Sequence, residues 1–161
     1  IENAILQQFG GDSFVTGVLV RLDLATGQLE LVNAGHPRPL LLRGRRVVGE
    51  IPSEPTPPFG LGASCQEPDR LALEPGDTVV LYTDGITEGR APDGQEFGTA
   101  RLADFLEREA ASEREPEEVL RRLVRAVLDH QGGMLRDDAT MVLLRWDGPP
   151  ADLVPKQGPT G

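Results

Sequence analysis

Acidic side chains stand beside two apolar segments of this sequence, where they could bind a metal ion. Asp84 and Gly85 follow the run TVVLYT, and Asp137 and Asp138 directly precede the run ATMVLLRW. Neighbouring carboxylates repel one another unless a cation accompanies them. Their oxygen atoms suit Mg²⁺ or Mn²⁺, and the sequence has no Cys/His spacing typical of zinc. Taken singly, each pair also fits a plainer interpretation, a turn for Asp84-Gly85 and a strand-entry cap for Asp137-Asp138.

The carboxylates can meet only if the segments that carry them are neighbours in a sheet. Residues 78–83 form a continuous apolar run, which is typical of a strand buried on both faces. Residues 139–146 form the last predicted strand. If the two strands are antiparallel neighbours, the end of one lies beside the start of the other, and Asp84 and Asp137 converge at one edge of the sheet. Gly85 would let the backbone turn sharply and would leave room beside the carboxylate.

The two histidines offer the only alternative catalytic set. His36 lies between Gly and Pro in the segment NAGHP and is interpreted as structural rather than catalytic, and His130, near a helix end, is expected on the surface. The sequence has no Gly-x-Ser-x-Gly elbow and no Cys/His pair. Gly60-Leu61-Gly62 lacks the lysine and the following helix of a phosphate-binding loop. No side chain is therefore assigned as a catalytic acid, base or nucleophile.

Hairpin strands dominate the first half of the sequence and helices follow late. Period-two patterns and turn residues predict strands over residues 14–24, 29–33, 39–43, 46–51 and 71–73, before the strands at 78–83 and 139–146. Residues 1–9 look like the end of a helix, a second helix starts with Thr99 as N-cap, and a third has Pro116 in its first turn. The apolar stripes expected to be buried are Leu102, Phe105 and Leu106, and then Val119, Leu120, Leu123, Val124, Val127 and Leu128. Antiparallel hairpins with clustered helices indicate an α+β fold rather than alternating β-α-β units.

Composition argues against several classes of partner. The net charge of −10 disfavours binding to nucleic acid or to an anionic membrane. The arginines at 43, 45 and 46 are interpreted as the exposed tip of a hairpin rather than as a basic binding patch. No apolar run is long enough for a membrane helix. The single cysteine, Cys65, excludes an intrachain disulfide and fits a reducing cytoplasm.

Six short motifs in order resemble the SpoIIE-like PPM phosphatases, which are related to protein phosphatase 2C. They are FVT (14–16), NAGHP (33–37), PFGLG (58–62), LEPGD (73–77), YTDGITE (82–88) and DDAT (137–140). The resemblance runs from about residue 12 to 146. It implies an antiparallel β-sandwich flanked by helices in α-β-β-α layers, with a two-metal Mn²⁺/Mg²⁺ site. It also implies that Asp84 and Asp137 are metal ligands, with Asp138 beside them and Gly85 next to the ion.

The resemblance further implies hydrolysis of phosphoserine or phosphothreonine by a metal-activated water. The substrate would be a regulatory phosphoprotein, for example an anti-sigma-factor antagonist, and the phosphatase would be fused to a sensor domain in a cytoplasmic protein. These expectations are analogies with the family.

One departure from the family pattern matters. Family members begin with a further stretch whose Gly-Asp and Asp-Gly segments supply a metal-bridging aspartate, and Asp12 stands at the wrong place to replace it. We therefore expect residues 1–146 to be the C-terminal portion of the domain, without its N-terminal strands, and residues 147–161 to be a Pro/Gly-rich tail or linker. Such a fragment alone would be inactive. Two alternatives stay open, a catalytically incompetent binding or regulatory module, and a homodimer that covers the open sheet.

Overall fold

The chain divides into two compact units, each built around an antiparallel sheet. The computed structural model describes residues 1–10, 13–54, 56–62, 67–112 and 114–152. The first unit comprises Ile1–His36, Pro52–Asp77 and Trp146–Gly161, and the second comprises Pro37–Ile51 and Thr78–Arg145. The expectations for Asp12, for Cys65 and for residues 153–161 of the tail lie outside the described residues.

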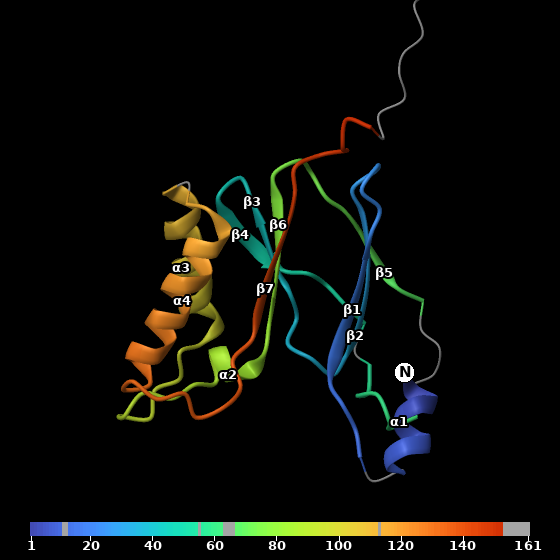
Figure 1. The fold of residues 1–161 in the computed structure, drawn as a ribbon, viewed down its shortest axis with the longest axis horizontal. Helices are drawn as coiled ribbons and strands as arrows, with labels where there is room; N and C mark the ends of the chain where they lie inside the picture. The colour runs from blue at the N-terminus through green and yellow to red at the C-terminus, as the bar shows by residue number, and fades with distance from the viewer. Residues whose placement is uncertain (11–12, 55, 63–66, 113, 153–161) are drawn as a thin grey trace, which may run out of the picture. The chain divides into compact units, whose positions relative to one another are not determined.

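The first unit contains one helix and a three-stranded sheet (Figure 1). Helix α1 spans Glu2–Phe9, and strands β1 (Gly17–Leu22), β2 (Gln28–Ala34) and β5 (Asp69–Ala72) lie in the order β1-β2-β5. Both pairings are antiparallel, and Leu29 of β2 lies opposite Leu22 on one side and Leu71 on the other. The predicted hairpin is confirmed. Its first strand is shorter than residues 14–24 because Val15 exchanges both backbone hydrogen bonds, each 2.9 Å long, with Phe59 instead.

The second unit is built on a four-stranded sheet. Strands β3 (Leu40–Arg43), β4 (Arg46–Glu50), β6 (Asp77–Tyr82) and β7 (Met141–Trp146) lie in the order β4-β3-β6-β7. Strand β3 is antiparallel to both β4 and β6. Just past the end of β6, the Thr83 N–H donates to the Thr140 carbonyl at 3.0 Å, and just before its start the Gly76 N–H donates to the Trp146 carbonyl at 2.7 Å. Strands β6 and β7 are therefore antiparallel neighbours, the arrangement on which the predicted convergence of Asp84 and Asp137 depends.

Three helices accompany this sheet. They are α2 (Asp84–Thr87), α3 (Thr99–Ala111) and α4 (Pro116–His130), and Figure 1 shows α3 and α4 side by side along the sheet. The start of α4 at Pro116 agrees with the prediction. The prediction of Thr99 as N-cap was wrong by one residue, because the Gly98 carbonyl already accepts the first helical hydrogen bond, from Leu102 at 3.2 Å. The four-residue helix α2 was not predicted.

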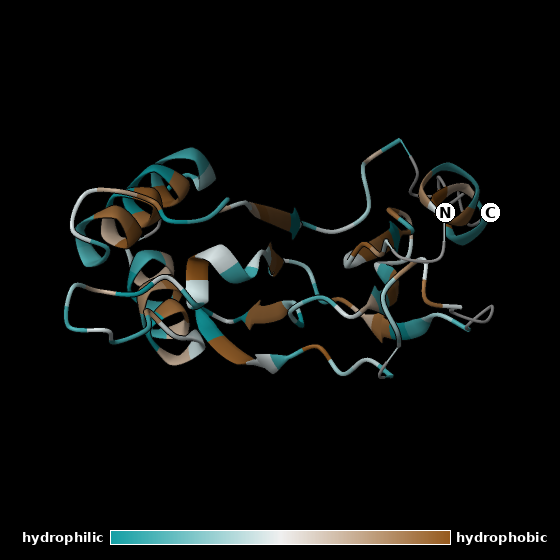
Figure 2. Cartoon of the chain, turned by 90° about the horizontal axis from the view of Figure 1, so that it is seen from below, coloured by the Kyte–Doolittle hydropathy of each residue, from teal (hydrophilic) through white to brown (hydrophobic). Residues whose placement is uncertain are grey.

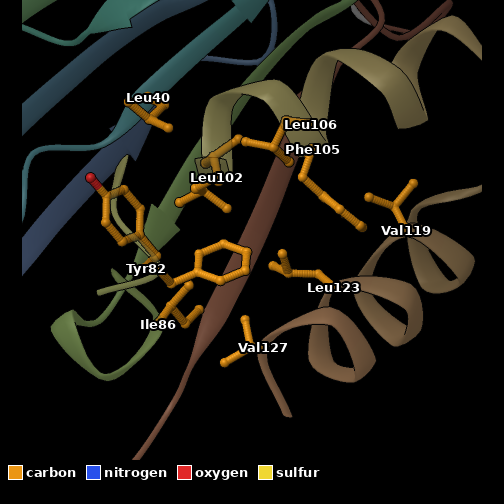
Figure 3. Close-up of a cluster of buried hydrophobic side chains, with 11 residues drawn as sticks. Leu40, Tyr82, Ile86, Leu102, Phe105, Leu106, Val119, Leu123 and Val127 are labelled. Carbon is orange, nitrogen blue, oxygen red and sulfur yellow. The ribbon is translucent and has the colours of Figure 1, made fainter. Parts of the chain in front are cut away.

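Apolar side chains from α2, α3 and α4, from the sheet and from the segment before α3 form one core in the second unit (Figure 3). The buried members are Leu40, Val80, Tyr82, Ile86, Phe97, Leu102, Phe105, Leu106, Val119, Leu123 and Val127. Figure 2 shows hydrophobic and hydrophilic residues on each of α3 and α4, as expected for amphipathic helices. The expectation that Val124 is buried was wrong: its side chain is 53% exposed. One step along a helix turns the side chain by roughly 100°, so the residue after buried Leu123 faces away from the core.

Tyr82, the last residue of β6, is the only tyrosine of the chain and is 4% exposed. Burial is the main cause that raises the pKa of its hydroxyl above the ordinary value of 10.0. The Glu50 carboxylate adds to this rise, and a hydrogen bond with Thr99 partly offsets it. The phenol is therefore held in its neutral form inside the core.

Two antiparallel sheets together with helices place the chain in the α+β class, as predicted. Within the described part of the chain, no helix combines the length and the apolar character needed to cross a membrane. The hairpin between β3 and β4 turns at Gly44 and Arg45, which both have positive φ angles. The arginine cluster therefore lies at a hairpin tip, as interpreted from the sequence.

Candidate functional site

Asp84 stands where the buried strand β6 leaves the sheet. Val79 and Val80 of β6 are fully buried, whereas the Asp84 side chain is exposed. The carboxylate Oδ1 of Asp84 accepts the N–H of Gly85 at 2.9 Å, and the Asp84 carbonyl accepts the N–H of Glu88 at 2.7 Å. The apolar strand thus fixes the backbone, and the local hydrogen bond orients the side chain at the sheet edge.

Asp137 and Asp138 lie in the loop that leads into β7. Both are exposed, and Asp137 Oδ1 accepts the N–H of Asp138 at 2.8 Å. This is the same carboxylate-to-next-residue bond that Asp84 makes. Each half of the candidate site therefore presents one carboxylate oriented by its own backbone.

Thr83 ties the two halves together. Its hydroxyl donates to the Asp138 carbonyl at 3.1 Å and accepts the N–H of Thr140 at 2.9 Å, beside the backbone bond from the Thr83 N–H to the Thr140 carbonyl. The residue immediately before Asp84 is therefore bonded to Asp138 and to Thr140, at the end of the loop that leads into β7. The two segments that the sequence predicted to converge do lie together.

Gly85 is the point of closest approach between the two halves. It is buried, and a Cβ atom added to it would lie 2.4 Å from the carbonyl oxygen of Asp138 and 3.0 Å from its carbonyl carbon. Real Cβ atoms do not come so near to backbone. The space beside Gly85 is thus filled by the backbone of Asp138, whereas the sequence predicted open room beside the Asp84 carboxylate.

These residues can provide part of the coordination shell of a hard cation. Carboxylate oxygens are the donors that Mg²⁺ and Mn²⁺ prefer, and Mg²⁺ demands close to octahedral geometry. Among the described residues, however, no three His, Cys, Asp or Glu side chains are grouped closely enough to hold a metal. The donor type fits a divalent ion, and further donors are needed to complete its shell.

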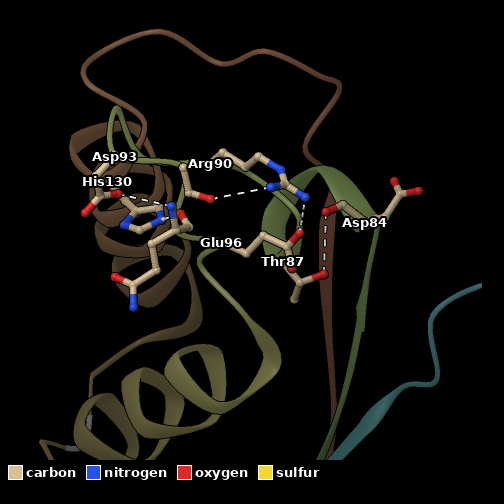
Figure 4. Close-up of polar contacts among 8 residues, drawn as sticks. Asp84, Thr87, Arg90, Asp93, Glu96 and His130 are labelled. Atoms are coloured by element: carbon tan, nitrogen blue, oxygen red, sulfur yellow. Dashed lines mark hydrogen bonds and ion pairs between the residues drawn. The ribbon is translucent and has the colours of Figure 1, made fainter.

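The segment after α2 is fastened to the end of α4 by polar contacts (Figure 4). Within the segment, Arg90 donates to the Glu96 carboxylate at 2.5 Å. At the end of α4, His130 Nδ1 accepts a hydrogen bond of 2.6 Å from the guanidinium of Arg101, a residue of α3. Because His130 Nδ1 accepts, His130 Nε2 carries the proton that is donated to the Gln95 carbonyl at 3.0 Å. The Asp84 carboxylate points away from the Arg90–Glu96 pair.

The histidines have structural surroundings. His130 packs edge-on against Phe97, with ring centroids 5.4 Å apart, and is half-buried rather than on the surface as expected. At the end of β2, Asn33 brackets His36: its Oδ1 accepts the His36 N–H at 2.8 Å and its Nδ2 donates to the His36 carbonyl at 2.9 Å. The turn geometry supports the structural interpretation of His36.

Two residues of this region were missed from the sequence. Thr83 was assigned only as the last residue of a strand. The signal that could have drawn attention to it is a hydroxyl side chain directly before Asp84, at the strand end, where it can bond to the backbone that leads into the neighbouring strand β7. Gln131 was not considered, and it is 4% exposed, directly after α4. No local pattern distinguishes it from a surface glutamine.

Comparison with solved structures defines the class of protein. The chain is similar to the SiaA-PP2C domain of Pseudomonas aeruginosa, with a TM-score of 0.77 and 25% identity over 91% of this chain and 58% of that one. It is similar to the RsbU and RsbW domains of Rv1364c from Mycobacterium tuberculosis, with a TM-score of 0.75 and 27% identity over 92% of this chain and 41% of that one. The catalytic domain of the serine/threonine protein phosphatase PstP, in complex with two manganese ions, matches at a TM-score of 0.60 and 18% identity, over 88% of this chain and 63% of that one. The fold is that of the PP2C phosphatase domains.

Residues 1–147 match the model of the family described as Stage II sporulation protein E (SpoIIE), and the chain belongs to that family. The resemblance drawn from the six motifs is confirmed. Among curated relatives, Protein IcfG of Synechocystis sp. (strain ATCC 27184 / PCC 6803 / Kazusa) is 29% identical over 122 residues, which is 75% of this chain and 19% of IcfG. The chain thus spans less than two thirds of each of these relatives.

Proposed function

We propose that this chain is part of the catalytic domain of a metal-dependent protein phosphatase that hydrolyses phosphoserine or phosphothreonine in a regulatory phosphoprotein. The observation that carries the proposal is the joining of Asp84 and the Asp137-Asp138 loop by Thr83 at one sheet edge, in a chain of the SpoIIE family. Carboxylates placed at the end of rigid strands are held more accurately than carboxylates on a free loop.

Manganese or magnesium is the proposed cofactor. Asp84, Asp137 and Asp138 would supply oxygen ligands, and Gly85 would let the two halves approach. The manganese complex of the similar protein PstP supports this choice. When bound, a pair of such ions lowers the pKa of a water molecule and neutralises charge on the transferring phosphoryl group. The role of this chain is to hold the carboxylates in a fixed orientation through Thr83 and through the N–H groups of Gly85 and Asp138.

The remaining ligands are proposed to lie in the part of the domain that the relatives have beyond the matched region. The chain covers 58% of the SiaA domain and 63% of the PstP domain, so a substantial part of each has no counterpart in it. We infer that residues 1–146 are the C-terminal portion of the domain and that residues 147–161 are a tail or linker.

Regulatory partners are proposed from the relatives. The Rv1364c chain carries an RsbU domain together with an RsbW domain, and this chain covers 41% of it. By analogy, we propose a cytoplasmic protein with a fused sensor domain whose substrate is a phosphorylated anti-sigma-factor antagonist.

The test is phosphate release from a phosphoserine protein by the natural full-length protein, with and without Mn²⁺. We expect Asp84→Asn and Asp137→Asn each to lower kcat/KM by at least about a hundredfold, because each removes a charged metal ligand. The matched control is Asp104→Asn, the same substitution at an exposed position of α3, which should retain activity. Activity that survives Asp84→Asn undiminished would contradict the assignment.

The alternative is a phosphatase-like binding or regulatory module. It is favoured by one observation, the lack of a three-ligand group among the described residues. Calorimetric titration of the full-length protein with Mn²⁺ separates the two functions. Binding that Asp84→Asn abolishes supports the enzyme, whereas a protein that binds its phosphoprotein partner but neither Mn²⁺ nor Mg²⁺ is the module.

A further inference from the structure

The loop between α4 and β7 carries Asp137 on exposed backbone. Residues 132–138 are all exposed, and none of them lies in a helix or a strand. A segment with few buried contacts opens easily, so hydrogen bonds from outside the loop are needed to fix the position of Asp137. On one side, the backbone N–H of Arg136 donates to Gln131 Oε1 at 3.1 Å. On the other side, the residue after Asp137 is held by the Thr83 hydroxyl.

Gln131 can hold the loop because its backbone belongs to the end of α4. Its N–H donates to the Val127 carbonyl at 3.0 Å, and Val127 is a member of the core at 2% exposure. Gln131 itself is 4% exposed. Since an N–H can pair only with an acceptor, the bond from Arg136 also fixes which end of the amide is oxygen. The acceptor for the loop is therefore fastened to a helix that packs in the core.

The other end of the amide packs against the segment that follows Asp84. A Cβ atom added to Gly89 would lie 2.1 Å from Gln131 Nε2 and 2.8 Å from its Cδ. Gly89 comes two residues after α2, the helix that begins at Asp84. The amide thus touches the segment after Asp84 and bonds the loop before Asp137. It is a second connection between the two halves of the candidate site, separate from that of Thr83.

The amide has a cost that the packing of the core does not explain. Nε2 is fully buried and has no acceptor among the described residues. Nearly all buried polar groups in native proteins are hydrogen-bonded, and an unpaired buried donor is unfavourable. A methionine, which is unbranched and has no polar hydrogen, would fill the same space without this cost. What the glutamine adds over a methionine is the acceptor for the Arg136 N–H.

The loop has space to move if this acceptor is lost. A pocket of about 240 Å³ lies beside it, and its lining includes Gly85, Gln131, Arg136 and Asp137. The share of one water molecule in the liquid is about 30 Å³, so water fits there and can accept the Arg136 N–H in place of Gln131. The hydrogen bond, rather than close packing, therefore keeps Arg136 and the adjoining Asp137 from shifting towards the pocket.

We propose that Gln131 is a positioning residue for the candidate metal site, because its Oε1 holds Arg136 and thereby fixes the backbone that carries Asp137. Gln131 contacts neither metal nor substrate, and its effect is on where Asp137 lies relative to Asp84. The proposal rests on the proposed function only in taking Asp137 as a metal ligand. Replacing a residue that orients a metal ligand typically weakens metal binding by about 10–100-fold. Since Gln131 acts through the backbone of the preceding residue, we expect the lower end of this range.

The test is Gln131→Met in the natural full-length protein, with metal affinity and stability measured separately. Calorimetric titration should show Mn²⁺ bound about tenfold more weakly. Urea unfolding with divalent metal chelated should show a midpoint that is unchanged or higher, because the unpaired buried donor is removed and water accepts the Arg136 N–H. A glutamine that serves stability alone would instead lower the midpoint. Gln8→Met, the same substitution at an exposed position of α1, should leave both quantities unchanged.

A metal-free measurement reports on the hydrogen bond itself. In hydrogen exchange followed by mass spectrometry, the Arg136 amide should exchange severalfold faster in Gln131→Met, while the amides of β6 should keep their rates. If Gln131→Met does not fold, Gly89→Ala takes its place, because the added Cβ displaces the Gln131 amide and the φ angle of Gly89 is not positive. It should weaken Mn²⁺ binding to a similar extent.

The outcome is separable from that of the proposed function. Mn²⁺ affinity that is unchanged in Gln131→Met, or that falls only in step with stability, overturns the positioning role and leaves the proposed function standing. If the unaltered protein binds no Mn²⁺, the proposed function fails. In that case faster exchange at Arg136 in Gln131→Met still supports Gln131 as the anchor of the loop, and unchanged exchange overturns it.

Discussion

Substituting Gly85 by alanine tests whether the two halves of the candidate site depend on one close backbone approach. The added Cβ would lie 2.4 Å from the Asp138 carbonyl oxygen, whereas ordinary contacts begin at 3.4 Å. The loop that carries Asp137 and Asp138 must therefore move by roughly 1 Å, the difference between these two distances. It cannot move freely, because the same carbonyl accepts the Thr83 hydroxyl.

The expected cost has two parts. Overpacking against well-ordered neighbours lowers the free energy of unfolding by about 1–3 kcal/mol. Metal–ligand distances in protein sites vary by only about 0.2 Å, so a shift of roughly 1 Å between Asp84 and Asp137 should weaken Mn²⁺ binding at least about tenfold. If the protein is the proposed phosphatase, kcat/KM should fall further, since a misplacement of about 1 Å can cost on the order of 10²-fold in rate.

The assay is urea unfolding followed by circular dichroism, together with calorimetric titration of Mn²⁺ into the full-length protein. Gly17→Ala is the matched control, because its Cβ would meet only the edge of the Phe59 ring at 3.4 Å and its φ is not positive. It should change the unfolding free energy by no more than about 0.5 kcal/mol. If Gly85→Ala unfolds and binds Mn²⁺ like the unaltered protein, the close approach does not hold the site together.

Three further predictions concern the elements that carry the site. Thr83→Val should cost about 1 kcal/mol of unfolding free energy, because it removes two hydrogen bonds between segments, and Thr83→Ser should restore most of it in urea unfolding. Leu123→Ala, at a position 2% exposed, should cost about 2–5 kcal/mol, while Val124→Ala one residue on should cost under about 1 kcal/mol; equal costs would contradict the assigned face of α4. Burial raises the pKa of Tyr82, so its contribution to stability is complete below pH 10.0 and is lost as the pH rises through the folded-state pKa. Absorbance titration of this single tyrosine, and unfolding of Tyr82→Phe, which should lose this alkaline dependence, check the direction.

The strand that carries Asp84 could be predicted because its signal is local. Six consecutive residues without a charge, followed by Asp-Gly, leave few alternatives to a buried strand that ends at the sheet edge. The helices α3 and α4 could be predicted for the same reason, because helix caps and an apolar stripe can be recognised within a short stretch of sequence. The wrong prediction that Val124 is buried shows the limit of such local signals, because an apolar residue at the edge of a stripe can face either the core or the solvent.

The sequence did not show that β6 pairs with β7. The convergence of Asp84 and Asp137 could therefore be predicted only on the condition that these two strands are neighbours. Thr83 and Thr140 are 57 residues apart, and no local pattern shows which strands of a sheet become neighbours. The burial of Gln131 is even harder to predict from the sequence. It depends at once on the end of α4, on the close approach of Gly89 and on the loop at Arg136. Burial of a polar side chain is a property of the packed chain, and the sequence around Gln131 resembles that of any helix end.

The contacts of Asp138 connect the loop that leads into β7 with the end of β6. The carbonyl of Asp138 is held by the Thr83 hydroxyl and closely contacted by Gly85, the two residues that flank Asp84. A change in the relative position of β6 and β7 is therefore expected to alter the distance between the two acidic segments. If Asp84 and Asp137 bind the metal as proposed, variants that loosen the pairing of β6 with β7 should lose Mn²⁺ binding before they lose the fold.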